Sequence, residues 1–450
     1  MESPDRPPRL FVTSDGKNLF FTFALVSSLF LLWGTCNSMI DVMDKHFQEE
    51  LHLTLSQSAW VQFAHYLGYC IMSLPAGWLA TKLGYKGGII AGLLLVAVGG
   101  FWFIPATHIA SFWAFLLGVC IIASGLTFLE TVANPYSTVL GHQHYAATRI
   151  NIAQSCNGVG WIIGPLIGGV FFYSKDAAGQ STGSETLYIP YVTIAVVVLV
   201  LAAVFFFANV PDIKADEAEP RAGEPPEIPR SIWGRPHFLC AVAAQFFYVA
   251  AQAGIFGFFL NYMTSQTPPL PASWGTGFMA SWLETGKSGA LVLTNQGAAG
   301  LASAAFFFFL AGRVAGSVIL GLVSAHLTLG VYAVINIALC AVVFCKLGWI
   351  SVGAVFLIYF FMSIMFPTIF ALGIHDLGKG AKIASALIVM AIMGGALLPK
   401  LMGHVADVYD MSRSFIVPLF CFIIIALYAF LWPRLSGSEG LRSIDPRRGH

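Results

Sequence analysis

Long apolar stretches alternate with short polar ones along almost the whole chain. A helix needs about 20 mainly apolar residues to cross the hydrocarbon core of a bilayer. Twelve stretches meet this requirement: 19–43, 57–80, 86–105, 110–136, 150–173, 188–209, 236–263, 294–323, 328–346, 349–373, 383–406 and 413–433. The pattern predicts an all-α membrane protein with twelve transmembrane helices.

Polar segments divide this pattern into parts. Residues 210–235 are charged and rich in proline, which is typical of a linker, and residues 264–293 form a second polar insertion between the seventh and eighth spans. The first 18 residues lack the apolar core of a signal peptide, so we expect the first span to be retained. The predicted parts are an N-terminal tail (1–18), a six-helix bundle (19–209), a linker (210–235), a second six-helix bundle (236–433) and a C-terminal tail (434–450).

Composition agrees with the membrane assignment. Hydrophobic residues make up 57% of the 450 residues and charged residues 10%, whereas soluble domains carry roughly 25% charged residues. The net charge of +1 comes without a basic patch, so we expect no nucleic-acid partner. The eight cysteines lack the CxxC spacing of metal and redox sites, so we expect no metal and no cofactor.

The distribution of Lys and Arg predicts the orientation of the chain. Loops on the cytoplasmic side of a membrane are enriched in these residues. If both tails are cytoplasmic, most of the 23 Lys and Arg residues lie on that side. We therefore expect a multi-pass protein of the plasma (inner) membrane with both termini in the cytoplasm.

The two halves of the chain repeat a pattern of glycine and proline. Spans four and five match spans ten and eleven with the same spacings: Pro135 and Gly141 match Pro367 and Gly373, and Gly160, Pro165 and Gly169 match Gly394, Pro399 and Gly403. Internal repeats joined by a cytoplasmic linker are typical of secondary transporters, whose substrate binds between the repeats near the midplane.

Six motifs resemble those of the fucose–galactose–glucose:proton symporters of the major facilitator superfamily, in the same order and on the corresponding spans. They are "GTCNSMID", "ETVANPYSTVLG", "RINIAQSCNGVG", "AQFFYVAAQ", "MSIMFPTIFALGIHDLG" and "SALIVMAIMGG". The resemblance implies the major facilitator fold, with two pseudo-symmetric six-helix bundles. It also implies proton-coupled monosaccharide uptake by alternating access, with Asp41 and Glu130 in the positions of the family's coupling acids.

The sequence departs from the pattern of the resemblance in two places, one loop and one span. Thr81 and Lys82 stand where the loop between spans two and three of the superfamily carries Asp and Arg. Phe366 stands where fucose-type members have Tyr before the proline of span ten. The second departure removes a hydroxyl group from the expected wall of the C-terminal half.

Polar residues three or four apart share a helix face on several spans. Facing lipid, such groups are costly: a carboxylate at the bilayer centre costs about 2.5–3.5 kcal/mol on insertion scales. We therefore expect them to line a hydrated cavity. The predicted substrate-binding residues are Asn37, Glu130, Asn134, Gln154, Asn157, Gln252 and Phe366, and the predicted proton-coupling residues are Asp41 and Glu130.

This set of side chains suits a sugar. Amides offer donors and acceptors to hydroxyl groups, and carboxylates add stronger, charge-assisted bonds. Aromatic residues can cover the C–H face of the ring; the candidates are Trp33, Phe128, Tyr136, Phe256 and Phe366. We expect a lopsided site, polar in the N-terminal half and aromatic in the C-terminal half.

Several of the same residues could instead have structural roles. Glu130 could pair with a buried Arg, and Asp41 could be a hydrated residue at the outer mouth, near Asp44. Asn134 and Asn157 could tie helices together by hydrogen bonds.

Three other functions remain as alternatives to a symporter: an uncoupled sugar facilitator, a proton antiporter and, remotely, a polytopic membrane enzyme. The loops 210–235 and 264–293 hold no catalytic cluster and no phosphate-binding loop. We therefore expect a transporter and not an enzyme. Its expected partners are a monosaccharide, protons and the lipid bilayer, and we expect a monomer.

Overall fold

The computed structural model describes residues 10–13, 16–141, 146–173, 188–211, 232–270, 282–286, 290–375, 377 and 381–437. The N-terminal half contains α1 (Phe20–Glu50), α2 (Leu55–Ser58), α3 (Trp60–Ile109), α4 (Phe112–Val139), α5 (Ala146–Phe172) and α7 (Tyr188–Phe207). The C-terminal half contains η2 (Ile232–Gly234), α8 (Pro236–Gly257), α9 (Phe259–Gln266), β1 (Leu283–Thr285), β2 (Leu291–Leu293), α10 (Asn295–Leu322), α11 (Ala325–Phe344), α12 (Trp349–Met362), α13 (Met365–Gly373), α14 (Ala381–Met390), η6 (Ala391–Met393), α15 (Gly394–Val408), η7 (Arg413–Phe415) and α16 (Ile416–Ser436).

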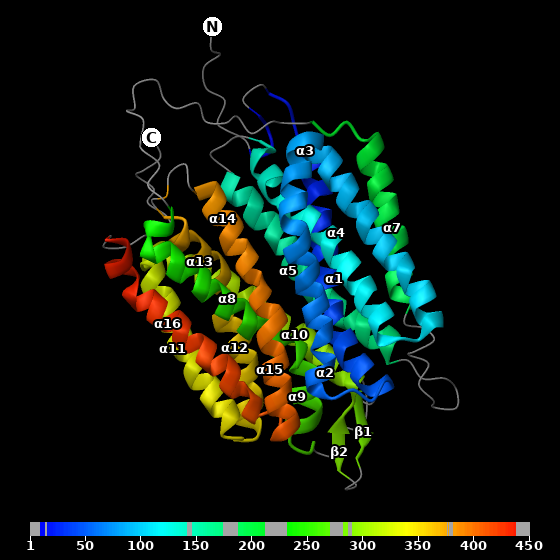
Figure 1. Cartoon of the computed structure of the whole chain (residues 1–450), viewed down its shortest axis with the longest axis vertical. Helices are drawn as coiled ribbons and strands as arrows, with labels where there is room; N and C mark the ends of the chain where they lie inside the picture. Colours follow the sequence, from blue (N-terminus) through cyan, green and yellow to red (C-terminus); the bar gives the residue numbers. More distant parts are fainter. Residues whose placement is uncertain are drawn as a thin grey trace.

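The helices form two bundles that lie side by side (Figure 1). In the first, α1 packs on α5 and α3 packs on α4 and α7; in the second, α8 and α11 pack on α16. The short antiparallel strands β1 and β2 lie at one end of the molecule, called here the hairpin end. The start of α1 and the end of α16 lie at the opposite end (Figure 1).

Eleven helical segments of the described chain are long and apolar enough to cross a membrane. The remaining predicted span is the first part of α3, between Trp60 and Gly84. Gly84 has φ 71° and ψ −179° inside the 50-residue α3, a conformation that glycine adopts without a steric penalty. The helix changes direction there, so α3 supplies both the second and the third predicted spans.

Three predicted spans are divided in the structure. Phe258 separates α8 from α9, Ser363 and Ile364 separate α12 from α13, and the 3₁₀ segment η6 separates α14 from α15. The apolar pattern predicts a continuous helix in each. In transporters, an interrupted helix leaves backbone N–H and C=O groups near the midplane without helical hydrogen bonds. Two of these breaks border the candidate site.

Candidate functional site

Asp41 lies inside the molecule on α1. One of its carboxyl oxygens, Oδ1, accepts a hydrogen bond of 2.8 Å from Nε2 of Gln62 on α3. Oδ2 has no hydrogen-bond partner among the described residues. Asp41 is 7% exposed, which argues against a hydrated residue at the outer mouth.

The C-terminal half reaches this carboxyl group through a glycine. A Cβ atom added to Gly257, the last residue of α8, would lie 2.9 Å from Nε2 of Gln62. Any larger side chain would therefore push against the donor that holds Asp41. The absence of a side chain at residue 257 lets the two bundles meet beside the acid.

Asn37 and Trp33 lie one and two turns before Asp41 on the same helix. The indole Nε1 of Trp33 donates a 2.7 Å hydrogen bond to the hydroxyl of Tyr69 on α3. Asn37 lies beside Tyr69 and its Oδ1 has no hydrogen-bond partner among the described residues. An unsatisfied buried acceptor is costly, so Asn37 is a good position for a ligand hydroxyl.

Glu130 lies on α4 and is half-buried. It lines a small pocket whose other residues are Leu29, Phe30, Trp33, Leu129 and Ala133. The hydroxyl of Tyr66 lies within electrostatic range of Asp41, Glu130 and Tyr248. Tyr66 therefore lies near both acids, and its ring packs against Gly395 of the C-terminal half.

Three of the predicted amides of the N-terminal half, Asn134, Gln154 and Asn157, each donate to a protein group, and two of them bond to each other. Nε2 of Gln154 on α5 donates to Oδ1 of Asn134 at 3.0 Å, and Nδ2 of Asn134 donates to the carbonyl of Glu130 at 3.0 Å. Nδ2 of Asn157 donates to the carbonyl of Phe30 at 3.2 Å. These bonds tie α4 to α5 and α5 to α1. An amide has two donor hydrogens and an acceptor, so capacity for a ligand remains.

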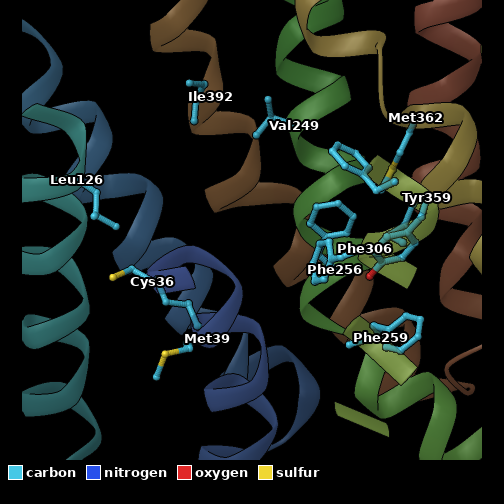
Figure 2. Close-up of a cluster of buried hydrophobic side chains, with 14 of the residues drawn as sticks. Cys36, Met39, Leu126, Val249, Phe256, Phe259, Phe306, Tyr359, Met362 and Ile392 are labelled. Atoms are coloured by element: carbon cyan, nitrogen blue, oxygen red, sulfur yellow. The ribbon is translucent and has the colours of Figure 1, made fainter. Parts of the chain in front are cut away.

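The opposite wall is aromatic. Phe256 on α8 stacks on Tyr359 of α12 with ring centroids 4.6 Å apart, and meets Phe306 of α10 at 4.9 Å. Figure 2 shows this group across from Cys36 and Met39 of α1. The ring centroid of Trp161, on α5 of the N-terminal half, lies 4.9 Å from the ring centroid of Phe306. This wall offers ring faces and few hydrogen-bonding atoms.

The predicted C-terminal residues lie near a helix break. The Tyr248 hydroxyl on α8 donates to the carbonyl of Met362 at 3.1 Å, where α12 ends. Phe366, half-buried at the start of α13, has its ring centroid 6.2 Å from that of Tyr248. Gln252, one turn after Tyr248, is half-buried on α8.

A cation also belongs to this wall. Arg313 on α10 lies over the ring of Phe309, with 5.1 Å between Cζ and the ring centroid. Its Nε is buried without a hydrogen-bond partner among the described residues, and its charge lies within range of Tyr248. The ion pairs of the described chain, Lys45–Glu49 and Lys346–Asp410, involve neither Arg313 nor Glu130.

Sequence reasoning missed the contribution of α3. Gln62, Tyr66 and Tyr69 lie on one face of this helix at spacings of four and three residues, and all three approach the acids or their neighbours. The same-face rule that selected residues on spans one, four, five and seven would have found them. His65 lies in the same stretch, with its ring centroid 5.0 Å from those of Tyr66 and Tyr69.

A separate groove on the C-terminal half is wholly apolar. Its lining includes Phe308, Leu339, Ile350 and Leu357 from α10, α11 and α12, and three of these side chains are exposed. Because the groove offers no hydrogen-bonding side chain to a sugar and lies on the outside of the bundle, it is a lipid-facing surface.

The two halves are joined at the hairpin end. Asp407 on α15 accepts 2.8 Å hydrogen bonds from the backbone N–H groups of Leu55 and Ser56 at the start of α2. The ammonium group of Lys400 lies 4.1 Å from the centroid of the Trp60 ring. Nδ2 of Asn295 donates to Glu49. These contacts hold the two halves together at this end.

Comparison with known proteins agrees with this architecture. The profile of the Major Facilitator Superfamily matches residues 20–398. The chain is 33% identical to the L-fucose-proton symporter of Escherichia coli K12 over 431 residues, which cover 92% of this chain and 93% of that protein. It is 31% identical to the glucose/galactose transporter of Brucella abortus, and the aligned residues cover 95% of this chain and 98% of that protein.

A solved structure extends the comparison to three dimensions. The crystal structure of the Escherichia coli fucose:proton symporter matches with a TM-score of 0.64 and 32% identity, over 92% of this chain and 99% of that one. The prediction of a major facilitator fold with twelve helices in two related bundles is thereby confirmed. The chain belongs to the Major Facilitator Superfamily and, within it, to the family of the fucose:proton symporters and the glucose/galactose transporters.

Proposed function

We propose that the protein is a secondary active transporter that carries a monosaccharide into the cell together with a proton. The observation that supports this most is that two acids inside the N-terminal half, Asp41 and Glu130, both lie within electrostatic range of Tyr66, which contacts the C-terminal half. The relatives named above are a fucose:proton symporter and a glucose/galactose transporter. The substrate class is a hexose, a deoxyhexose or an N-acetylhexosamine.

The two acids divide the work in this proposal. Glu130 anchors sugar hydroxyl groups by charge-assisted bonds, and Asn37, Asn134, Gln154, Asn157 and Gln252 complete the polar contacts. Asp41 binds the proton. Phe366 and Phe256 cover the apolar face of the sugar ring.

Alternating access follows from the cost of burying charge. A protonated Asp41 is neutral, so closing the cavity around it avoids most of the penalty that an unpaired carboxylate would cause. The bundles then rock about the loaded site, and the sugar and proton leave on the other side. One charge moved across 100 mV yields about 2.3 kcal/mol, which at about tenfold per 1.4 kcal/mol supports roughly 40-fold accumulation.

The proposed setting is the plasma (inner) membrane with both termini in the cytoplasm. The positive-inside bias of the loops supports this orientation, and it places the hairpin end outside. Residues 19–209 and 236–433 would act as the two rocking bodies, joined by the cytoplasmic linker 210–235, with tails at 1–18 and 434–450. The working unit is a monomer, because the site is built within one chain.

The experiment that tests the proposal uses liposomes that contain a pH-sensitive dye, with no gradient imposed. Monosaccharides are added outside, one at a time, to wild type and to Glu130→Gln. We expect one sugar to acidify the interior of the wild-type liposomes and no change with the variant. Radiolabelled sugar that equilibrates without acidification would identify an uncoupled facilitator, and alkalinisation would identify an antiporter; either result would contradict symport.

A further inference from the structure

A second carboxyl group is buried next to Asp41. Asp44 lies three residues further along α1, on the same face and about 4.5 Å further along the helix axis. It is 0% exposed. Neither of its carboxyl oxygens has a hydrogen-bond partner among the described residues.

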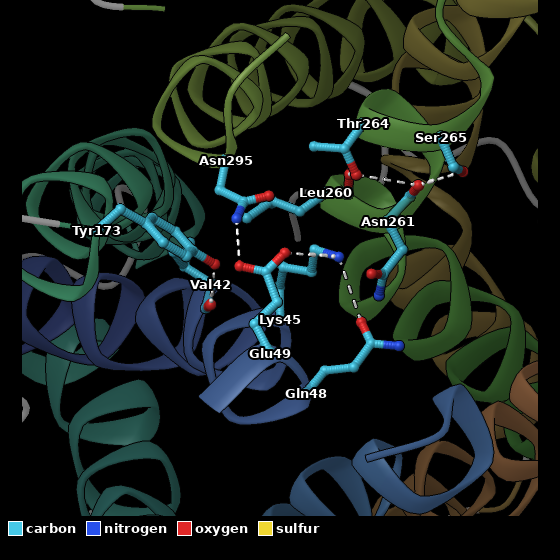
Figure 3. Close-up of polar contacts among 10 residues, drawn as sticks. All are labelled: Val42, Lys45, Gln48, Glu49, Tyr173, Leu260, Asn261, Thr264, Ser265 and Asn295. Carbon is cyan, nitrogen blue, oxygen red and sulfur yellow. Dashed lines mark hydrogen bonds and ion pairs between the residues drawn. The ribbon is translucent and has the colours of Figure 1, made fainter. Parts of the chain in front are cut away.

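No described cation is paired with Asp44. Lys45, the neighbouring base, lies within electrostatic range, but its ammonium group is 3.1 Å from Oε1 of Glu49 and 3.5 Å from Oε1 of Gln48. Figure 3 shows Lys45 turned toward these two residues.

The other described groups that face Asp44 carry no positive charge. Ser58 of α2 lies beside it, with its hydroxyl donating to the carbonyl of Leu55 at 3.1 Å. Tyr173, which follows α5, lies within electrostatic range, and its hydroxyl donates to the carbonyl of Val42 at 3.1 Å. The environment of Asp44 is therefore buried, polar in part and without a counter-charge.

Two ionised carboxylates in this arrangement would repel each other and would both be poorly solvated. One proton held between them removes most of that cost. Interacting groups of this kind titrate as a pair and not as separate residues. The proton can sit on either group, because moving it from one carboxyl to the other carboxylate leaves the charge of the pair unchanged.

We propose that Asp44 and Asp41 form one proton-binding pair, in which Asp44 passes the proton between Asp41 and the hairpin end. Its role in transport rests on the proposed function; the shared proton does not. Polar groups continue beyond Asp44 in that direction: Gln48, Glu49, Asn295 and Asn261 lie around the next turn (Figure 3). Nδ2 of Asn261 is buried without a hydrogen-bond partner among the described residues, so it can hold a water molecule on this route.

Infrared difference spectroscopy tests the shared proton without any transport. The C=O stretch of a protonated carboxyl group is followed during a pH titration of wild type, Asp41→Asn, Asp44→Asn and the double variant. We expect each single variant to change the titration of the remaining group and the double variant to remove the part of the band that the pair contributes, leaving that of Glu130. If the band and its titration in Asp44→Asn equal those of wild type, the pair does not exist.

Proton-driven sugar uptake tests the relay. We expect Asp44→Asn to lower its rate about tenfold, less than the roughly hundredfold or more typical of a sole acid–base group, because Asp41 stays in place. Asp44→Glu, which restores a carboxyl group, should recover most of the rate and the pH profile. Glu284→Gln, which removes an exposed carboxylate on β1 at the same end, is the matched control and should behave as wild type.

The outcomes separate this inference from the proposed function. Wild type that moves no protons with any sugar contradicts symport, whereas the infrared titration still decides whether the pair exists. Uptake by Asp44→Asn at the wild-type rate and with the wild-type pH profile would overturn the relay. If neither Asp44 variant folds, a band in Asp41→Asn that titrates at a different pH from wild type supports the pair, and an unchanged titration overturns it.

Discussion

The two walls of the candidate site are built from different chemistry. The N-terminal wall holds Asp41, Glu130 and a chain of amides that bond to one another and to backbone carbonyls. The C-terminal wall is a cluster of stacked rings around Phe256 with one cation, Arg313, at its side. The two related bundles therefore present different chemistry, and in the proposed mechanism one binds protons and hydroxyl groups while the other gives shape and excludes water.

This difference has a mechanical meaning. Hydrogen bonds depend steeply on distance and angle, whereas ring contacts tolerate sliding and tilting. A site with its directional bonds on one bundle keeps the sugar attached to that bundle while the other moves over it. The four predictions that follow test this division, from the largest expected effect to the smallest.

Asp41→Asn should abolish accumulation. With a potential of 100 mV, the ratio of sugar inside to outside should fall from roughly 40 to about 1, because the variant moves no charge with the sugar. The measurement is the steady-state ratio of radiolabelled sugar in proteoliposomes. Exchange of labelled for unlabelled sugar, measured at equal concentrations, is the control for folding. A ratio that stays near the wild-type value would remove Asp41 from the coupling mechanism.

Phe366→Tyr should make the aromatic wall selective for hydroxyl groups. A site that gains a buried hydroxyl discriminates between sugars that can and cannot satisfy it, so the ratio of kcat/KM for two hexoses that differ at one hydroxyl should change about tenfold. Phe308→Tyr adds the same atom on the lipid-facing side, where Phe308 is 39% exposed, and serves as the control. Equal ratios in both variants would place Phe366 away from the sugar.

The Asn134–Gln154 bond should contribute a coupling energy of about 1 kcal/mol to stability, within the range of interhelical hydrogen bonds in membrane proteins. The measurement is a double-mutant cycle of Asn134→Ala and Gln154→Ala on the free energy of unfolding in mixed micelles. Sugar affinity measured on the same variants separates binding from packing. Additive effects on unfolding would mean that the two amides act independently.

Asp410→Asn should have the smallest effect, since this acid lies outside the membrane spans. Partial burial raises the pKa of Asp410, but the bonds from Lys346 at 2.7 Å and from the N–H of Arg413 at 3.1 Å outweigh it, so the pKa lies below its usual value. The pair should add less than about 1 kcal/mol to stability. Because the folded-state pKa is lowered, this contribution is present above about pH 4 and is lost as the pH falls further. A thermal-stability difference that grows on acidification would contradict the assignment.

The sequence predicted most of what hydrophobicity and helix periodicity control. The twelve-helix fold followed from the apolar pattern. The same-face rule placed Asn134 and Glu130 on one face of a helix and predicted that such polar faces would meet. The burial of Asp44 was not predicted, because its position near the end of a long helix looks like a hydrated one. Its burial depends on α2 and α5, which pack over it from other parts of the chain.

The interruptions of α8 and α12 differ in what the sequence shows. The break at Ser363 lies four residues before Pro367, which has no N–H for the carbonyl of residue 363 and crowds it, so the proline marks this break. The break at Phe258 lies in apolar sequence without such a proline. The sequence also does not show that the Tyr248 hydroxyl binds the carbonyl of Met362. A single-sequence pattern cannot report a partner that lies more than a hundred residues away.

The contact between Asp407 and α2 limits which substitutions the two sides of the contact can accept. The donors are the main-chain N–H groups of Leu55 and Ser56, which the capping box of Thr54 and Gln57 holds in place. Side chains at positions 55 and 56 can therefore be exchanged among most amino acids without losing the two bonds, whereas proline at either position would delete one. On α15 the acceptor is a side chain, so nearly any replacement of Asp407 removes both bonds at once. One partner in this contact is free to vary and the other is not.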